Sequence, residues 1–455
     1  MKSPLLLAAA TGLILAAAVG VASVREEGGP MAPAVPAGMG APSGSTWGDS
    51  GERVPLPTEA HVAGIPWFQT LVNEAPAGSV LKVPPGTYSG PVVVNKALTI
   101  EGGGQVTIDG GGKGTVFVLD TSDATLRGVN LTNSGASHDS DDACLNVRGD
   151  RNVVEKVRIT DCLFGIDLKQ SNQNKLLHNY IRSKPFDLGT RGDAIRLWYS
   201  RENLVEGNEI EDSRDTVAWY ANDNIFRNNV GRRSRYSIHF MFAQHNVVEG
   251  NQFYDNAVGV YVMYTEGIHI RNNLISHATG ATGMAIGFKE ASNAVVEGNE
   301  IIYCSTGIGS DLSPFEPGTR VDIRNNRIAY NGVGIAFASD KDGSVVEGNS
   351  FEGNLSDVAV AGGGGANGNL WRGNHWDDYQ GFDRNHDGVG DTPYELYAYA
   401  DRLWMEVPFA RFFKNAPMME ALDFLERLAP FSTPELLLKD EAPIFKKPSP
   451  RKDAS

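Results

Sequence analysis

The sequence has few clusters of basic residues, few cysteines and few long stretches with a helix-forming composition. There are 40 Lys and Arg residues against 55 Asp and Glu residues, so the formal net charge is -15. Nucleic acid binding needs clustered cations that neutralise phosphates, and this balance disfavours it. Glycine contributes 52 of the 455 residues and asparagine is frequent, and both residues favour turns over helix interiors. Because short runs of Val, Ile, Leu and Phe are plentiful, disorder is also disfavoured, which leaves a large, turn-rich, mostly β protein.

The long apolar run of the sequence is at its N-terminus. Lys2 precedes an apolar stretch from Pro4 to Ala22 with small residues near its end, the pattern of a secretory signal. We predict a signal peptide over residues 1–24 and a flexible Gly/Pro/Ala/Ser-rich linker over residues 25–57. An uncleaved membrane anchor is the alternative, since the run is near the lower length limit for spanning a bilayer. In both cases the rest of the chain is exported.

The chain has three cysteines, Cys144, Cys162 and Cys304. An odd number in an oxidising compartment leaves at least one of them unpaired. Cys144 and Cys162 are candidates for a disulfide between adjacent layers. Buried free thiols that pack as small apolar groups are an equally good interpretation.

An internal repeat determines the fold class. The segment Asn203-Leu-Val-Glu-Gly-Asn-Glu-Ile210 recurs as Asn224-Ile-Phe-Arg-Asn-Asn-Val230 and as Asn246-Val-Val-Glu-Gly-Asn-Gln-Phe253. Units of roughly 20 to 30 residues with alternating apolar stretches bury their apolar face only against copies of themselves. We therefore predict an all-β fold over residues 58–397, a right-handed parallel β-helix. The asparagines that anchor the coils, expected in left-handed corners with hydrogen-bonded ladders, are Asn179, Asn208, Asn229, Asn251, Asn273, Asn299, Asn326, Asn349 and Asn374.

Aligning the coils on these asparagines stacks the other side chains in columns. The first column reads Trp198, Trp219, Met241 and Met263. Its neighbour reads Tyr199, Tyr220, Phe242 and Tyr264, followed by Phe288 after a one-residue offset. Two residues before the first column stand Arg196, Val217, His239 and Tyr261. Strand alternation puts the residues between these columns inside the coil, namely Leu197, Ala218, Phe240 and Val262.

The outward columns predict a binding face. Two thioethers, Met241 and Met263, beside the imidazole of His239 are soft ligands that suit Cu(I). Met284 lies in the next coil and is a further candidate ligand. A large outward patch of Trp and Met side chains is also typical of a protein-binding surface, and plain packing under a loop is a third interpretation. All three interpretations stay open on spacing alone.

A second motif has calcium-loop spacing. Asp383, Asn385, Asp387 and Asp391 stand at loop positions 1, 3, 5 and 9, Gly388 stands at position 6, and Val389 offers its carbonyl. Position 12 is Tyr394 instead of the usual Glu, with Glu395 as a possible substitute. An Asx-turn that closes the β-helix is the alternative to calcium, and both roles are structural.

Catalysis is the alternative reading of the fold, because parallel β-helices commonly carry glycan lyases, hydrolases and epimerases. Such enzymes use two carboxylates or an acid with a basic partner. Asp141-Asp142 and Asp377-Asp378 are paired acids, but no column aligns an Asp pair with Arg and Lys in successive coils. We therefore predict that the chain is not an enzyme.

The last residues, 398–455, break the repeat. A stripe of apolar residues after Pro417 predicts a helix, so we expect a short, mostly helical C-terminal extension that either caps the rod or docks on a membrane partner. The Leu436–Leu438 run favours the second role. Together with two residues of the outward face, the predicted docking residues are Trp198, Trp219, Trp404, Phe412, Phe413, Met418, Leu422, Phe424, Leu425 and Leu428.

These segments together resemble the NosD family, the periplasmic β-helix proteins of nitrous oxide reductase maturation. The motifs that carry the resemblance span nearly the whole mature chain and include Arg191-Gly-Asp-Ala-Ile-Arg-Leu-Trp-Tyr-Ser200, Arg235-Tyr-Ser-Ile-His-Phe-Met241, Val262-Met-Tyr264, Gly287-Phe-Lys-Glu290, Asp311-Leu-Ser-Pro-Phe-Glu-Pro317, 376–385 and 422–431.

The resemblance implies a function and partners. It implies a periplasmic protein attached to the inner membrane through a permease with a cytoplasmic ATPase. It implies delivery of copper to nitrous oxide reductase, or assembly of its copper centre, with a periplasmic copper chaperone as a further partner. It also strengthens the prediction of transient Cu(I) binding at His239, Met241 and Met263, and makes the C-terminal segment the permease-docking element. A glycan-active enzyme and a docking scaffold without metal are the alternative functions.

Overall fold

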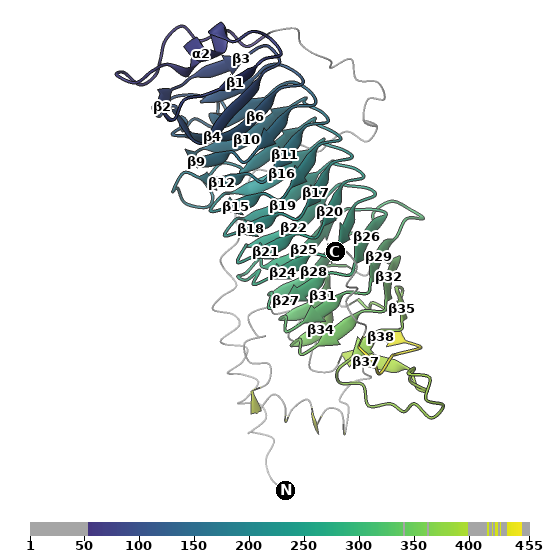
Figure 1. Cartoon of the computed structure of the whole chain (residues 1–455). Helices are drawn as coiled ribbons and strands as arrows, with labels where there is room; N and C mark the ends of the chain where they lie inside the picture. The colour runs from purple at the N-terminus through teal and green to yellow at the C-terminus, as the bar shows by residue number, and fades with distance from the viewer. Residues whose placement is uncertain are drawn as a thin grey trace. The chain divides into compact units, whose positions relative to one another are not determined.

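The computed structural model describes residues 53–339, 342–361, 364–398 and 435–447, together with residues 416, 417, 421, 424, 425 and 428. These residues form a parallel β-helix in which coils are stacked along one axis (Figure 1). One face of the stack is a 12-stranded parallel sheet, and two further faces are the two ladders of a 24-stranded sheet. The prediction of an all-β parallel solenoid is confirmed. The predicted signal peptide and most of the predicted linker lie outside the described residues.

The strands follow one another in a fixed order around each coil. The 12-stranded sheet consists of β3 (Val92–Val94), β5 (Phe117–Leu119), β7 (Ala143–Val147), β10 (Phe164–Lys169), β13 (Ile195–Trp198), β16 (Asp215–Trp219), β19 (Tyr236–Met241), β22 (Val258–Met263), β25 (Met284–Lys289), β28 (Thr306–Asp311), β31 (Val333–Phe337) and β34 (Ser356–Val360). The first ladder of the larger sheet consists of β1 (Val80–Lys82), β4 (Thr99–Asp109), β6 (Thr125–Thr132), β8 (Val153–Glu155), β11 (Lys175–Leu177), β14 (Leu204–Glu206), β17 (Ile225–Arg227), β20 (Val247–Glu249), β23 (His269–Arg271), β26 (Ala294–Glu297), β29 (Val321–Arg324), β32 (Ser344–Glu347) and β35 (Leu370–Arg372). The second ladder runs through the later halves of β4 and β6 and consists otherwise of β2 (Gly86–Ser89), β9 (Arg158–Cys162), β12 (Tyr180–Ser183), β15 (Glu209–Glu211), β18 (Val230–Arg232), β21 (Gln252–Tyr254), β24 (Leu274–Ser276), β27 (Glu300–Ile302), β30 (Arg327–Ala329), β33 (Ser350–Glu352) and β36 (His375–Trp376).

An asparagine ladder makes the corner between the two ladders of strands. The backbone N–H and the Nδ2 of Asn208 both donate to Oδ1 of Asn229, at 2.9 and 3.0 Å, and the pattern repeats from Asn179 to Asn374. The predicted ladder is present, but the prediction that these asparagines are left-handed is wrong. The left-handed residue is the one before, Gly207 (φ 65°) or Asn228 (φ 55°), because the ladder side chain must point into the coil to reach the next asparagine.

Successive corners alternate in size and charge. Where one coil has Asn228 as its left-handed residue, the next has Gly250, and a Cβ at Gly250 would lie 2.7 Å from Oδ1 of Asn228. Glu-Gly-Asn corners alternate with Arg-Asn-Asn corners over residues 206–349, and the last corner is Arg372-Gly373-Asn374. Acids therefore lie opposite bases along the outer surface. The aligned residues are Glu206, Arg227, Glu249, Arg271, Glu297, Arg324, Glu347 and Arg372.

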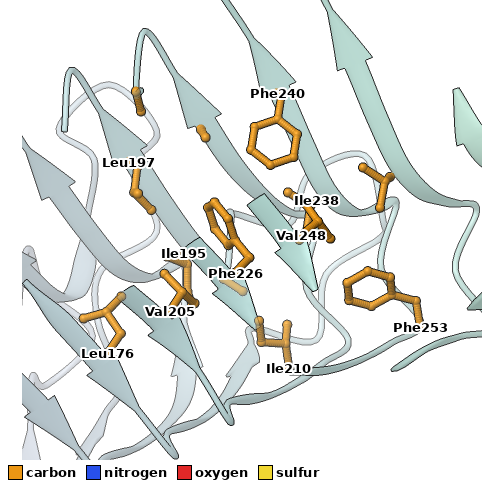
Figure 2. Close-up of a cluster of buried hydrophobic side chains, with 14 of the residues drawn as sticks. Leu176, Ile195, Leu197, Val205, Ile210, Phe226, Ile238, Phe240, Val248 and Phe253 are labelled. Carbon is orange, nitrogen blue, oxygen red and sulfur yellow. The ribbon is translucent and has the colours of Figure 1, made fainter. Parts of the chain in front are cut away.

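The core fills the inside of the stack with stacked aliphatic and aromatic side chains. Figure 2 shows Phe226 of β17 and Phe240 of β19 facing each other across the coil, with ring centroids 5.5 Å apart and edge to face. Both are fully buried, and burial of each such ring stabilises the fold by roughly 2–3 kcal/mol. Because inward positions alternate along each strand, the opposite positions of the 12-stranded sheet are left facing outward.

A short helix that the repeat did not predict covers the first coil. The helix α2 (Phe68–Glu74) inserts the fully buried Phe68 beside Tyr88, with ring centroids 5.5 Å apart. Gln69 donates through Nε2 to the carbonyl of Val93 at 3.0 Å and accepts the Val93 N–H at 2.7 Å. Its amide thereby replaces a neighbouring strand at the edge of the 12-stranded sheet, which protects that edge from pairing with another chain.

The C-terminal residues close the other end of the stack. Strand β38 (Glu435–Asp440) pairs antiparallel with β37 (Tyr394–Ala398). Leu437 and Leu438 expose 2% and 0% and complete the core, so these two leucines do not support the docking role of the C-terminal extension. Asp440 accepts from the N–H and Nδ2 of Asn374 at 3.0 and 2.9 Å and ends the asparagine ladder.

The predicted helix between β37 and β38 falls mostly outside the described residues, as do Trp404, Phe412, Phe413, Met418 and Leu422. The described Phe424, Leu425 and Leu428 have helical conformation and expose 61%, 55% and 66%. The mostly helical extension therefore stays a prediction. Within the part of the chain that the structure describes, no helix has the length and apolar character needed to cross a bilayer.

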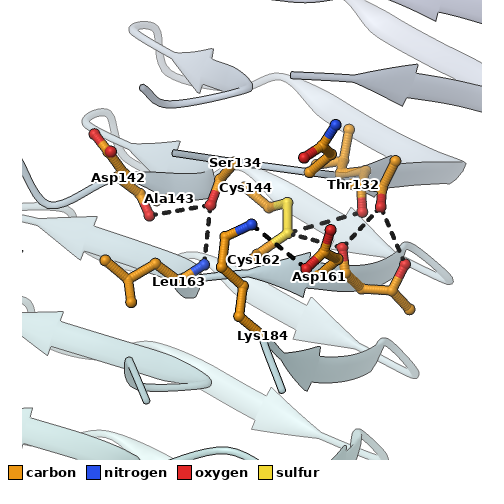
Figure 3. The surroundings of a disulfide bond; sticks show 12 residues. Thr132, Ser134, Asp142, Ala143, Cys144, Asp161, Cys162, Leu163 and Lys184 are labelled. Atoms are coloured by element: carbon orange, nitrogen blue, oxygen red, sulfur yellow. Dashed lines mark hydrogen bonds and ion pairs between the residues drawn. A yellow bond between two sulfur atoms is a disulfide. The ribbon is translucent and has the colours of Figure 1, made fainter. Parts of the chain in front are cut away.

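Two of the three cysteines are bonded. Cys144 in β7 and Cys162 in β9 form a disulfide with Cα atoms 5.6 Å apart, which joins two faces of the coil (Figure 3). Lys184 pairs with Asp161 beside it at 3.4 Å. Cys304 is free, and burial raises the pKa of its thiol to about 11, which keeps the thiol protonated and unreactive.

Candidate metal centre

The outer surface of the 12-stranded sheet carries the predicted columns in register. Trp198 pairs with Trp219, Trp219 with Met241, and Met241 with Met263. In this column Lys289 follows Met263, and Lys169 precedes Trp198. The residues predicted to face inward, Leu197, Ala218, Phe240 and Val262, are all fully buried. The alignment on asparagines therefore predicted which side chains share the outer surface.

The neighbouring aromatic column is also present up to Tyr264. Tyr199, Tyr220, Phe242 and Tyr264 stack with ring centroids 4.8, 5.1 and 5.0 Å apart. The prediction that Phe288 continues this column is wrong, because Phe288 pairs with Val262 and is buried at 2% exposure. The additional residues of that coil lie before β25 and leave the register within the strand unshifted.

His239 and Met263 are in direct contact on this surface. Nε2 of His239 lies 3.2 Å from Sδ of Met263. The imidazole packs against the stacked pair of Tyr236 and Tyr261, with ring centroids 4.9 and 6.0 Å away. Burial lowers the pKa of His239 to about 4, so the ring is neutral and its nitrogen lone pair is available near pH 7. Met241 stands directly opposite Met263, one strand spacing of about 4.8 Å away.

This ligand set is neutral, soft and partly exposed. Two thioethers and one imidazole suit a soft monovalent ion such as Cu(I) better than a hard divalent ion. His239 is 9% exposed, and Met241 and Met263 are half-buried. The side chains that meet here therefore fit a soft metal ion at a partly exposed position.

Comparisons with known proteins point in the same direction. The family described as "Periplasmic copper-binding protein (NosD)" matches residues 177–381, which include all the outer columns. A Pseudomonas aeruginosa protein named "Probable ABC transporter binding protein NosD" is 27% identical over 401 residues, which is 80% of this chain and 87% of the relative. This chain is thus similar to the NosD family over residues 177–381 and to a relative of that name over most of its length. A Stutzerimonas stutzeri protein of the same name is 33% identical over 132 residues, 28% of this chain and 29% of the relative.

The NosD relatives are named as transporter-associated binding proteins and not as enzymes. A solved structure with the same fold is the A-module of the Azotobacter vinelandii mannuronan C-5 epimerase AlgE6. It superposes with a TM-score of 0.52 at 15% identity and covers 66% of this chain and 92% of that chain. At this identity the likeness shows the fold alone.

Met284 stands apart from Met241 and Met263. It pairs with Val258, whereas the residue opposite Met263 is Lys289. Its Sδ lies over Gly287 and Gly309 beside the ring of Tyr261. Since Gly287 follows Tyr261 in the column of His239, the Tyr261 ring stands between that column's imidazole and Met284. Met284 instead lines a cleft of about 230 Å³ together with Tyr261, Phe288, Gly309, Asp311 and Phe337.

A charged cluster that the sequence did not reveal lies at the other end of the face. Arg196 pairs in register with Asp167 and donates to it through Nε at 2.8 Å, and through another guanidinium nitrogen to Asp141 at 2.9 Å. Lys169 bonds Asp141 at 2.8 Å. The cluster joins side chains of different columns: Arg196 follows Asp167 in one column, Lys169 stands in the neighbouring column, and Asp141 precedes β7. It therefore does not align an Asp pair with Arg and Lys in one column.

The charged cluster does not resemble an acid–base pair. Burial raises the pKa of Asp141, but the hydrogen bonds from Arg196 and Lys169 outweigh it and hold the pKa below its usual range. An ionised carboxylate between two cations has no proton to donate at neutral pH. The other paired acids lie elsewhere: Asp377 and Asp378 bring carboxylate oxygens within 4.8 Å of each other and of Asp357.

The predicted calcium loop is an exposed turn between β36 and β37. Its side chains accept backbone N–H groups of the loop: Asp383 from Gly388 at 3.0 Å, Asn385 from Asp387 at 3.2 Å, and Asp387 from Val389 at 2.8 Å. Gly388 has φ 85°, as the sharp turn at position 6 requires. The second oxygen of Asp383 is buried without a hydrogen-bond partner in the described structure, which fits an oxygen ligand.

Two features of this loop limit its affinity for a cation. Tyr394, at position 12, is buried and stacks on Trp376 at 4.4 Å. Glu395 accepts the hydroxyl of Tyr397 at 2.8 Å and lies 3.8 Å from Lys439. Neither residue supplies the bidentate carboxylate of a high-affinity calcium loop.

Proposed function

We propose that this chain is a periplasmic accessory protein that carries Cu(I) for the maturation of nitrous oxide reductase. The observation that carries the proposal is the contact of His239 with Met263, with Met241 opposite Met263 on the same outer surface. Soft, neutral ligands on an accessible sheet surface suit a cargo ion that is passed on. The names of the family and of its relatives, copper-binding and transporter-binding, support the same function.

A copper titration tests this proposal. Anaerobic competition between the protein and a chromophoric Cu(I) chelator should give one tight site in the wild type. The double variant Met241→Leu/Met263→Leu should weaken it by at least about 100-fold, since even groups that only orient ligands contribute about 10- to 100-fold to metal affinity. His245→Ala is the control, because the His245 side chain is 60% exposed beside Asp223 and outside the columns. Unchanged affinity in the double variant would place the copper elsewhere.

The proposal extends to partners. We place the permease and its cytoplasmic ATPase at the C-terminal extension, where Phe424, Leu425 and Leu428 expose apolar surface. We place exchange with the reductase and with a periplasmic copper chaperone on the outer face around Trp198 and Trp219, because aromatic patches favour protein contact. Loading of apo-reductase in vesicles that contain the transporter should require ATP, this chain and both methionines.

Two alternatives make different predictions. A docking scaffold would bind the reductase equally well with and without Met241 and Met263, and would show no copper affinity. A glycan-active enzyme would turn over an acidic polysaccharide without copper. The ion-paired state of Asp141 and Asp167 favours neither a general acid nor a nucleophile at that end of the face.

A further inference from the structure

Trp219 is the aromatic neighbour of the methionine pair. In its column it has two neighbours, Trp198 on one strand and Met241 on the next. The two indoles meet edge to face with ring centroids 4.8 Å apart. Met241 is therefore flanked by Met263 on one side and by an indole on the other, each one strand spacing of about 4.8 Å away.

The indole of Trp219 is held by packing and not by a polar anchor. Its Nε1 is buried and has no hydrogen-bond partner among the described residues, although buried indole N–H groups usually find one. Besides Trp198, the indole of Trp219 also lies against the ring of Tyr220, with planes 14° apart and centroids 6.4 Å apart. An unbonded indole in this position is explained if its π-system has a role of its own.

The ligand set leaves a charge that an aromatic ring can stabilise. Thioethers are uncharged, and histidine binds metals as the neutral imidazole, so an ion held by His239, Met241 and Met263 keeps its full positive charge. Asp215, the acid whose charge acts on the pKa of this histidine, is held by Arg235 through both carboxylate oxygens. No carboxylate among the three ligands offsets the charge.

We infer that the Trp219 indole forms a cation–π contact with the Cu(I) held by His239, Met241 and Met263. The inference rests on the proposed function, because it needs copper at this site. Tryptophan is the aromatic residue that binds cations best, and the contact is strongest where water is excluded. Trp219 thereby contributes to the affinity for the monovalent ion and shields one side of it.

Variants of the two tryptophans separate this role from plain packing. Cu(I) affinity, measured by anaerobic competition, should fall about 2- to 30-fold in Trp219→Leu and by less in Trp219→Phe, which keeps a weaker π-system. Trp198→Leu and Trp198→Phe should leave the affinity within about twofold. Cu(I) should quench part of the tryptophan emission in the wild type and in Trp198→Phe, and this change should be lost in Trp219→Phe.

The outcomes distinguish a failure of the Trp219 contact from a failure of the copper site itself. If the methionine double variant loses copper while both Trp219 variants keep full affinity, the inference fails and the proposed function stands. If the double variant keeps its affinity, the site itself is wrong. Equal losses in the Trp198 and Trp219 variants would show packing instead of a cation–π contact. Should Trp219→Leu fail to fold by circular dichroism, the comparison of Trp219→Phe with Trp198→Phe decides.

Discussion

Nε2 of His239 lies 3.2 Å from Sδ of Met263, on adjacent strands of the 12-stranded sheet. In the absence of metal such a contact is a weak one for both groups, since sulfur is a poor hydrogen-bond acceptor. The pair is nevertheless held in place by the register of β19 and β22 and by the rings of Tyr236 and Tyr261. Two soft ligands are thus brought together by the backbone and by packing, before any ion arrives.

Met284 is expected to contribute little to copper affinity. Because it pairs with Val258 and lies beyond Tyr261, Met284→Leu should leave Cu(I) affinity within about threefold of the wild type, whereas the matched Met263→Leu should lower it by at least about tenfold. Chelator competition on both variants checks this expectation. Equal losses would mean that Met284 is a ligand and that the face rearranges on binding.

The ion pairs of Glu352 are expected to hold the C-terminal residues on the rod, and to be lost in acid. Burial raises its pKa, but Ser350, Arg327 and Lys447 donate or pair at 2.8, 3.2 and 3.1 Å and lower it to about 2. The folded-state pKa is below the unfolded value, so the stabilisation is present above about pH 4.5 and is lost as the pH falls toward 2.

Urea unfolding of wild type and Glu352→Gln measures this effect. The free energy of unfolding should differ most near pH 6, and the difference should shrink between about pH 4.5 and pH 2. Glu347→Gln is the control, because its pair with Arg372 is largely exposed and exposed pairs contribute little. A difference that stays constant across this range would contradict the assignment.

The outer face was predictable because stacking makes the register follow from the repeat. Once Asn208, Asn229 and Asn251 align, Trp219 must lie beside Met241. The same alignment also contains two pairs that were not drawn from it. Asp167 and Arg196 each stand 12 residues before a ladder asparagine, and Val262 and Phe288 each stand 11 before one, so the residues inserted before β13 and β25 leave both registers intact. The structures that close the two ends of the stack were not predictable, because the contacts of Gln69 and Asp440 follow no local sequence pattern. Asp440 bonds Asn374 across 66 residues of sequence.

The alternation of large and small corner residues can be tested by substitution of Gly250. Gly250→Ala should be destabilising for two reasons: its φ is 65°, and its Cβ would meet Oδ1 of Asn228 at 2.7 Å. Gly373→Ala is the matched control, with φ 67° and open space around the Cβ. The control should lose about 1 kcal/mol from the left-handed backbone alone, and Gly250→Ala about 2–3 kcal/mol. Thermal unfolding distinguishes the two, and equal losses would refute the steric part.

Asp440 is expected to hold the C-terminal strand on the rod. Its buried carboxylate accepts Asn374, Trp376 Nε1, Gly373 and Ala442 at 2.9 to 3.2 Å. Asp440→Ala leaves these donors without an acceptor and should cost about 3 kcal/mol or more. Hydrogen exchange should accelerate in β38 and β36 and stay unchanged in β19. Glu441→Ala, at a 69% exposed side chain, is the neighbouring control.

Calcium should raise the melting temperature, but only at high concentration. The loop offers Asp383, Asn385, Asp387 and the Val389 carbonyl, yet Tyr394 is buried and Glu395 is engaged. A loop without the bidentate carboxylate belongs with weak extracellular sites, whose dissociation constants are about 10⁻⁴ to 10⁻³ M.

A calorimetric scan in 5–10 mM calcium, roughly tenfold above that dissociation constant, should show a higher melting temperature than a scan in EDTA. Asp383→Ala should abolish the difference, because the one loop oxygen that is buried without a donor belongs to Asp383. If wild type melts identically with and without calcium, the loop is an Asx-turn cap whose acids serve its own backbone.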